Sequence, residues 1–187
     1  MTNFPTENGK GTYPYVILPF ESRMTPRFIQ AVVKGMTIML KEELKEATTI
    51  VLPEAKGFLL SVLSEVTGLD ITLIRKRNYR IPSQIVIEQR KVYKDKEGKN
   101  LMYCVGLKKD DRPLIVDDIV SSGGTQVTAI KALERHGYGI VGIGTVYERG
   151  NGIANVKKET GHTVKGLVRL EIRDNRPFVP RVLDTKF

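Results

Sequence analysis

The chain has 187 residues, of which 41% are hydrophobic and 27% charged, and this size and balance predict one globular domain over residues 1–187. No apolar run approaches the roughly 20 residues that cross a bilayer, and the N-terminus lacks the blocks of a secretory signal, so we expect a cytoplasmic protein. The net charge of +9 favours an anionic partner such as a phosphorylated metabolite or nucleic acid, although a solvated basic surface would carry the same charge.

The first long element is predicted to be an amphipathic helix over residues 24–47. Thr25 can cap this helix and Pro26 suits its first position. Its apolar residues recur at helical spacing, and they are Phe28, Ile29, Val32, Val33, Met36, Met39 and Leu40. A short apolar strand at 48–52, a helix at 58–68 that ends at Gly68 and a strand at 71–75 follow. Together they form one β-α-β unit.

Residues 84–107 are predicted to form a long antiparallel hairpin that projects from the sheet, because two apolar stretches flank the polar run KDKEGK. Cys104 lies in its second half. It is the only cysteine, which excludes an intramolecular disulfide, and with two histidines in the chain we expect no structural zinc site.

The remaining sequence repeats the β-α-β plan. A strand at 112–118, a turn at 121–125 and a helix at 125–137 are followed by a strand at 139–147, with one more strand at 164–174. Two such units predict an α/β fold with an open, mostly parallel sheet, helices on both faces and right-handed crossovers.

The string LIVDDIVSSGGT, residues 114–125, joins two carboxylates at a strand end to a turn of small residues. In open α/β sheets ligands bind beyond the carboxyl ends of the strands. The turn and the helix start offer N–H groups and hydroxyls to a phosphate, whereas Asp117 and Asp118 suit neutral donors such as ribose hydroxyls. A capped helix after a buried strand, with the acids exposed by chance, is the alternative. The string is neither a Walker A motif nor a dinucleotide fingerprint.

This string resembles the phosphoribosyl pyrophosphate (PRPP) signature of type I phosphoribosyltransferases, and the resemblance extends from about Ile50 to Gly161. PEAKGFLL resembles the pyrophosphate loop of that family. LIRKRNYRIPS and VYERGNG resemble stretches of adenine and related archaeal purine enzymes. The resemblance implies transfer of ribose 5-phosphate from PRPP to a purine base with release of pyrophosphate, and it implies a homodimer.

The resemblance also assigns residues to each part of the substrate. They are Asp117 and Asp118 for the ribose hydroxyls, Ser121, Ser122, Gly123, Gly124 and Thr125 for the 5′-phosphate, and Ala55, Lys56 and Gly57 for pyrophosphate. Arg75 and Lys76 either add positive charge on the same side or are solvated strand-end residues. Magnesium, held mainly through PRPP, and fixed cations would stabilise the leaving group as the sugar becomes oxocarbenium-like.

Two segments are implied as covers over the reaction. The hairpin 84–107 resembles a flexible loop that excludes water, and Glu88, Tyr93 and Lys94 are candidates to swing in, with Glu88 as the candidate for a catalytic role. A plain surface hairpin is equally open. Residues 1–24 resemble a small N-terminal hood that closes over the base through backbone groups near Val16 and Ile17.

The identity of the base depends on hydrogen-bond polarity. Many 6-oxopurine enzymes have an aspartate where this chain has Ser121, and a lysine near the end of the next strand that donates to the 6-oxo group. Here that strand ends with Glu148. A 6-amino group needs an acceptor, so both departures favour adenine. A 6-oxopurine such as hypoxanthine, guanine or xanthine stays open, since archaeal-type enzymes share the serine and the ERG string. Glu148 could also pair with Arg149 or a lysine.

Two rival functions use this fold. A regulator that senses PRPP while it binds RNA or DNA would suit the charge, but we find no helix-turn-helix and no aromatic-basic RNA platform. A PRPP synthetase needs two such domains, and the chain is too short for them. We therefore expect a purine-salvage enzyme without a nucleic acid or membrane partner.

Overall fold

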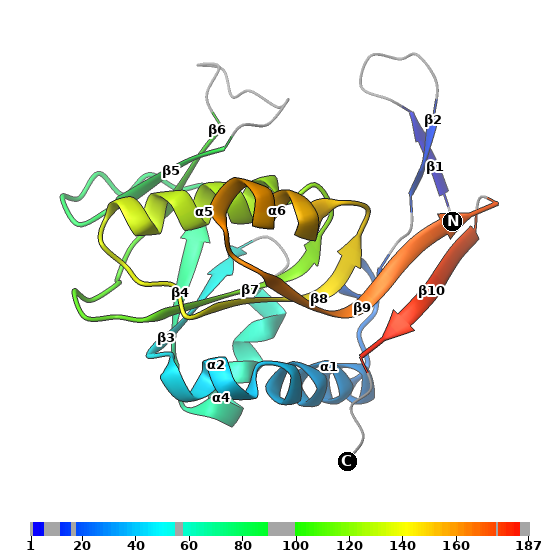
Figure 1. The fold of residues 1–187 in the computed structure, drawn as a ribbon, viewed down its shortest axis with the longest axis horizontal. Helices are drawn as coiled ribbons and strands as arrows, with labels where there is room; N and C mark the ends of the chain where they lie inside the picture. Colours follow the sequence, from blue (N-terminus) through cyan, green and yellow to red (C-terminus); the bar gives the residue numbers. More distant parts are fainter. Residues whose placement is uncertain are drawn as a thin grey trace.

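The central feature of the molecule is a twisted sheet of eight strands with helices on both faces (Figure 1). The computed structural model describes residues 2–5, 12–15, 18–54, 58–89, 100–174 and 176–183. The strands of the sheet are β3 (Thr49–Pro53), β4 (Asp70–Arg75), β5 (Ile85–Gln89), β6 (Asn100–Cys104), β7 (Pro113–Val120), β8 (Gly142–Arg149), β9 (Val164–Arg173) and β10 (Arg176–Val182). They lie in the order β10-β9-β8-β7-β3-β4-β6-β5.

Strands β9, β8, β7, β3 and β4 run parallel, while β10, β6 and β5 pair antiparallel with their neighbours. The expected α/β fold with an open, mostly parallel sheet is thus confirmed. The central strands are apolar on both faces: Val51 of β3 and Val116 of β7 have no exposed surface. This is the pattern of strands that are covered by helices on both sides.

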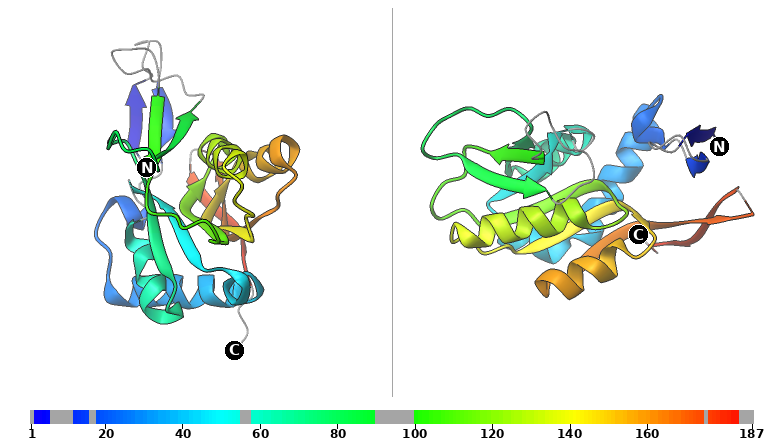
Figure 2. Two further views of the ribbon diagram at one scale, coloured as in Figure 1. Left: turned by 90° about the vertical axis from the view of Figure 1, so that its left-hand side faces the viewer. Right: turned by 90° about the horizontal axis from the view of Figure 1, so that it is seen from above.

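Helices cover the sheet in two groups (Figures 1 and 2). On one face lie α1 (Pro26–Met39), α2 (Lys41–Glu46), the 3-10 turn η2 (Phe58–Ser61) and α4 (Val62–Thr67), and on the other lie α5 (Gly124–Arg135) and α6 (Gly152–Thr160). Thr25 caps α1 as expected, since its hydroxyl accepts the N–H of Phe28 at 3.2 Å. Gly68 ends α4 in the left-handed conformation, with φ of 73°.

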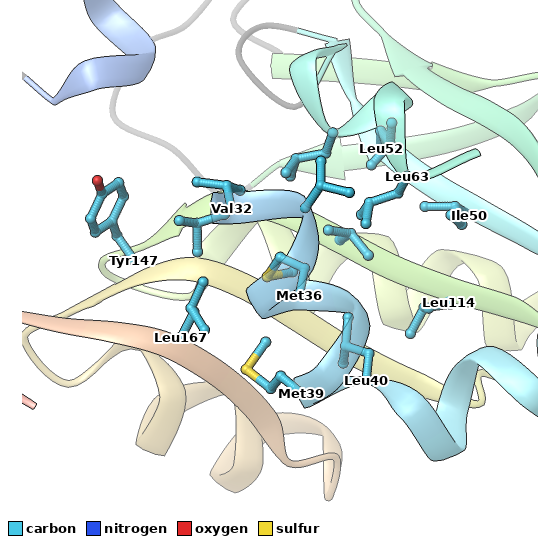
Figure 3. Packing of buried hydrophobic residues seen from close by; sticks show 14 of the residues in the cluster. Val32, Met36, Met39, Leu40, Ile50, Leu52, Leu63, Leu114, Tyr147 and Leu167 are labelled. Atoms are coloured by element: carbon cyan, nitrogen blue, oxygen red, sulfur yellow. The ribbon is translucent and has the colours of Figure 1, made fainter. Parts of the chain in front are cut away.

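The helix expected over 24–47 is divided in two at Leu40. Leu40 has φ −102° and ψ 18°, which is not helical, and only 1% of it is exposed. Its side chain lies over Gly144 of β8, where an added Cβ would be 2.6 Å from Leu40 Cδ1. Figure 3 shows Leu40 beside Met36, Met39 and Leu114 in this core. Burial of Leu40 in the core thus accompanies the break in the helix.

The expected hairpin is present in part, and residues 90–99, which include Tyr93 and Lys94, lie outside the described residues. Strands β5 and β6 pair antiparallel, and β6 joins β4 through the pairs Ile74–Cys104 and Arg75–Tyr103. Residues of the hairpin, among them Ile85 and Ile87, share a hydrophobic cluster with α5. The base of the hairpin is therefore an edge of the sheet.

Three further elements, all near the N-terminus, complete the described fold. The N-terminal residues form β1 (Thr2–Pro5) and β2 (Thr12–Tyr15), which pair with each other, and the 3-10 turn η1 (Pro19–Glu21). Helix α6 and strand β10 were not expected from the sequence. Helix α6 begins in a glycine-containing stretch, and β10 contains Pro177 and Pro180, so neither has a clear local signal.

Candidate active site

Several of the predicted site residues that the structure describes lie at the carboxyl edge of the parallel strands. Residue 54 follows β3, Arg75 ends β4, and Arg149 ends β8. The strand with the two acids is longer than expected, since β7 continues past Asp117 and Asp118 to Val120. The acids are therefore inside the strand and buried, with 7% and 4% exposed. This contradicts the alternative in which they are exposed by chance.

The carboxylate of Asp117 is held by two donors. Its Oδ1 accepts the N–H of Asp118 at 2.8 Å, and its Oδ2 accepts the side-chain amide of Gln126 at 2.5 Å. Gln126 lies in the first turn of α5 and is 3% exposed. Buried polar side chains of this kind are almost always hydrogen-bonded. Sequence reasoning missed Gln126, although a polar residue on the buried face of a helix that follows two acids was a usable signal.

The turn Ser121–Gly124, which we call the SSGG turn, joins β7 to α5. Gly123 has φ of 82°, and a Cβ there would lie 2.6 Å from the carbonyl oxygen of Gly152. Only glycine fits such a position. The first N–H groups of α5 begin at Gly124, and Ser122 Oγ lies 3.5 Å from the Gly124 nitrogen. The turn thus combines a helix start with hydroxyls, which is the chemistry of an anion site.

Positive charge lies at the end of β4. The guanidinium of Arg75 donates to Glu54 at 2.9 Å and to the Tyr79 hydroxyl at 3.0 Å, and both contacts raise the pKa of Arg75. Glu54 immediately precedes Ala55, Lys56 and Gly57, which lie outside the described residues. Arg75 is therefore fixed at Glu54, the last described residue before position 55. Lys76 follows it and is exposed.

Glu148, near the end of β8, is already paired. It is 7% exposed, and its two oxygens accept hydrogen bonds from Arg169 of β9 and, at 2.7 Å, from Arg181 of β10. These partners differ from those that the sequence suggested, because they belong to strands that lie beside β8 only in the folded chain. The two guanidiniums neutralise the charge of this carboxylate, so it attracts a further donor less strongly than a free carboxylate would.

Arg149 lies on the opposite face from Glu148. It is paired in register with Leu170, which shares a hydrophobic cluster with Phe20 and Tyr147. Since paired residues of neighbouring strands share a face, Arg149 lies on the same side as these two rings. Within the described part of the chain Arg149 forms no ion pair.

An aromatic cluster connects the N-terminal segment to this edge. Phe20 of η1 meets Tyr147 edge-on, with ring centroids 6.0 Å apart, and Phe28 of α1 at 5.4 Å. Burial raises the pKa of the Tyr147 hydroxyl. Val16 and Ile17, the backbone positions expected near the base, lie outside the described residues. Phe20 ties the segment that follows them to the end of β8.

A cavity of about 910 Å³ lies between β5, α5 and α6. Glu88, which is exposed on β5, lines this cavity, and so do Ser122 and Gly124 of the SSGG turn. Asn155 of α6 lines it as well. Neither Asp117 nor Asp118 does. The cavity thus reaches the turn from the α5 side.

The described residues contain no group of three or more histidine, cysteine, aspartate or glutamate side chains able to hold a metal. Among the same residues, no helix is long and apolar enough to span a bilayer.

Comparisons with known proteins agree with this geometry. A family model of the phosphoribosyl transferase domain matches residues 28–170. The chain is 35% identical to the hypoxanthine/guanine phosphoribosyltransferase of Methanotorris igneus over 91% of this chain and 92% of that protein. It is 36% identical to the enzyme of the same name from Methanothermococcus okinawensis, over 91% of each.

Among solved structures, the chain is similar to the adenine phosphoribosyltransferase of Thermoanaerobacter pseudethanolicus, with a TM-score of 0.69 and 22% identity over 90% of this chain and 94% of that one. At this identity the likeness supports the fold alone. The family match extends over most of the chain and includes both acids and the SSGG turn. The chain belongs to the phosphoribosyltransferase family.

Proposed function

We propose that this protein is a purine-salvage phosphoribosyltransferase that transfers ribose 5-phosphate from PRPP to a 6-oxopurine, hypoxanthine or guanine, and releases pyrophosphate. The single domain over residues 1–187 would act in the cytoplasm as a homodimer. The observation that carries the choice of base is the double pairing of Glu148 with Arg169 and Arg181. The relatives named above support the same choice, since they are hypoxanthine/guanine enzymes.

The adenine preference expected from the sequence rested on Ser121 and on Glu148 as an acceptor for a 6-amino group. That carboxylate is already occupied, and it lies on the face away from Phe20 and Tyr147. Arg149 is the side chain that ends β8 on the Phe20 face, and it is a donor without an acceptor function. A 6-oxo group needs a donor, so Arg149 supports a 6-oxopurine in this position.

The assignments of residues to PRPP follow from the place of each group. We assign the ribose hydroxyls to Asp117 and Asp118, and pyrophosphate to residues 55–57 with Arg75 and Lys76. The residues assigned to the 5′-phosphate are Ser121, Ser122, Gly123, Gly124 and Thr125. Residues 1–24 form the proposed hood, with the base contacts near Val16 and Ile17, and residues 84–107 form the proposed flexible cover, with Glu88 as a candidate proton donor or acceptor.

The reaction requires four functions from these residues. The SSGG turn anchors one end of the substrate, and the two acids hold the sugar as C1′ acquires positive charge. Arg75 stabilises the negative charge that develops on the leaving group. Magnesium, bound to PRPP, would add positive charge to that group. The two covers exclude water, which otherwise hydrolyses an oxocarbenium-like sugar.

A pyrophosphate-release assay with PRPP, magnesium and each base in turn tests the proposal. We expect hypoxanthine or guanine to be used at least about a hundredfold more efficiently than adenine. A site that offers a hydrogen-bond donor to a 6-oxo group leaves that donor buried and unpaired when the base carries a 6-amino group. Preference for adenine would overturn the choice of base but keep the transferase. No turnover with any base, together with salt-sensitive binding of RNA or DNA, would overturn the enzyme itself.

A further inference from the structure

One side chain connects the two halves of the signature. Gln126 of α5 and Asp117 of β7 are nine residues apart, and the entire SSGG turn lies between them. The hydrogen bond from Gln126 Nε2 to Asp117 Oδ2, at 2.5 Å, closes this loop. Both side chains are buried, with 3% and 7% exposed. The contact therefore ties the strand that carries the acids to the helix that carries the turn.

The orientation of the Asp117 carboxylate depends on this contact. One oxygen accepts the Gln126 amide and the other accepts the N–H of Asp118 at 2.8 Å. Rotation of the carboxylate would break these bonds, so they select one orientation.

An amide suits position 126 better than other side chains of its size. A hydrocarbon would leave a buried carboxylate oxygen without its donor, which is costly for a charged group. A glutamate would place a second negative charge against Asp117 and raise the pKa of the pair. Glutamine donates a hydrogen bond and leaves the charge of Asp117 unchanged.

We propose that Gln126 is a positioning residue: it holds the Asp117 carboxylate in the orientation that receives a ribose hydroxyl of PRPP, and it couples that orientation to the SSGG turn. This inference rests on the proposed function of Asp117 and the turn. Gln126 acts through Asp117 and does not contact the substrate itself.

The first test is Gln126→Leu, which keeps the approximate volume and removes the donor. We expect the KM for PRPP to rise about ten- to a hundredfold, the range for loss of a hydrogen bond to a charged group. The KM for the purine should change by less than about threefold. The matched control is Thr49→Val: Thr49 is 1% exposed and bonded to Asp70 and Thr72, but it starts β3 at the opposite edge of the sheet.

The control separates positioning from stability. Thr49→Val should lower the melting temperature and leave the KM for PRPP unchanged. If Gln126→Leu behaves like the control, with a lower melting temperature and a normal KM for PRPP, Gln126 only fills the core and the inference is wrong.

The second test is Gln126→Glu, which adds a pH signature. At low pH the two carboxyl groups share a proton, and this proton can replace the amide as the donor between them. The efficiency of the variant toward PRPP, relative to the parent protein, should therefore rise as the pH falls from about 8 to about 5. A ratio that is constant with pH would contradict the positioning role. If the Gln126→Leu variant does not fold, this second measurement tests the proposal in its place.

Assays of the unmodified protein separate the proposed function from the proposed role of Gln126. If it neither binds nor consumes PRPP, the proposed function fails and the role of Gln126 fails with it. If it uses PRPP and both variants have normal kinetics, only the role of Gln126 is overturned.

Discussion

The side-chain amide of Asn155 donates a hydrogen bond to the main-chain oxygen of Ser122, 3.2 Å away, so that α6 supports the backbone of the SSGG turn. Gly152, at the start of α6, makes the close approach possible, because an added Cβ would lie 2.5 Å from the carbonyl oxygen of Ser121. The glycine at position 123 has the same relation to the carbonyl oxygen of Gly152, at 2.6 Å. Backbone thus packs on backbone at the proposed phosphate site.

Gly152→Ala should displace the SSGG turn. We expect a loss of about 1–3 kcal/mol in the free energy of unfolding, as for other overpacked sites, and a higher KM for PRPP. Urea denaturation and steady-state kinetics measure the two effects. The control is Gly139→Ala, since a Cβ there meets nothing within 4 Å. A Gly152→Ala protein with the stability and KM of the control would show that the turn does not need this contact.

The acids are expected to affect turnover and not the fold. Asp118→Asn, alone or with Asp117→Asn, keeps the shape of the side chain and removes its charge. Loss of charged hydrogen bonds of this kind costs about 1.5–3 kcal/mol each, so kcat/KM for PRPP should fall by at least about tenfold per acid. Circular dichroism should show an unchanged fold. Normal kinetics of the double variant would remove the basis of the site assignment.

The sequence predicted the parts of the molecule that depend on local patterns. Two β-α-β units were readable because apolar strands alternate with amphipathic helices, and the cap at Thr25 and the end of a helix at Gly68 have local signals. Asp117, Asp118 and the SSGG turn were found because they are contiguous. The break at Leu40 was missed, since Leu40 is a good helix former whose place is decided by packing over Gly144.

The partners of Glu148 could not be predicted for a different reason. Arg169 and Arg181 are 21 and 33 residues away in sequence, and they reach Glu148 only because β9 and β10 lie beside β8. Glycines at α6 and prolines in β10 hid both elements. The argument for adenine used Ser121 and Glu148 and left open that Glu148 pairs with Arg149 or a lysine, whereas the partners in the folded chain are Arg169 and Arg181.

Cys104 supplies a prediction for alkaline pH. Burial of its thiol raises the pKa from 9.0 to about 12. Because the folded state disfavours the thiolate, the contribution of the neutral thiol is complete below about pH 9 and is lost as the pH rises toward about 12. The free energy of unfolding should fall over this pH range by on the order of a few kcal/mol. Cys104→Ala should show a shallower decline in urea denaturation at pH 9 to 11, and equal slopes for both proteins would contradict the burial argument.

The variant Glu148→Gln tests whether this carboxylate contacts the base and selects it. We expect the free energy of unfolding to fall by about 1–3 kcal/mol, because the charged hydrogen bonds to two half-exposed arginines are weakened. The preference between hypoxanthine and adenine should change by less than about threefold, since the carboxylate faces away from the proposed base site. A selective loss of adenine turnover would mean that Glu148 contacts the base.

Arg149→Met is the sharpest test of the proposed base. Methionine keeps much of the length of the side chain and removes the donor, so kcat/KM for hypoxanthine and guanine should fall about ten- to a hundredfold. Adenine, which would not use this donor, should lose much less, and the measured preference for 6-oxopurines should shrink. Arg112→Met is the control: it removes a half-exposed arginine that precedes β7 at the opposite edge and pairs with Glu46. Equal losses for all three purines would mean that Arg149 supports the strand end or the hood and does not select the base, and the donor to the 6-oxo group would then have to come from the backbone near Val16 and Ile17.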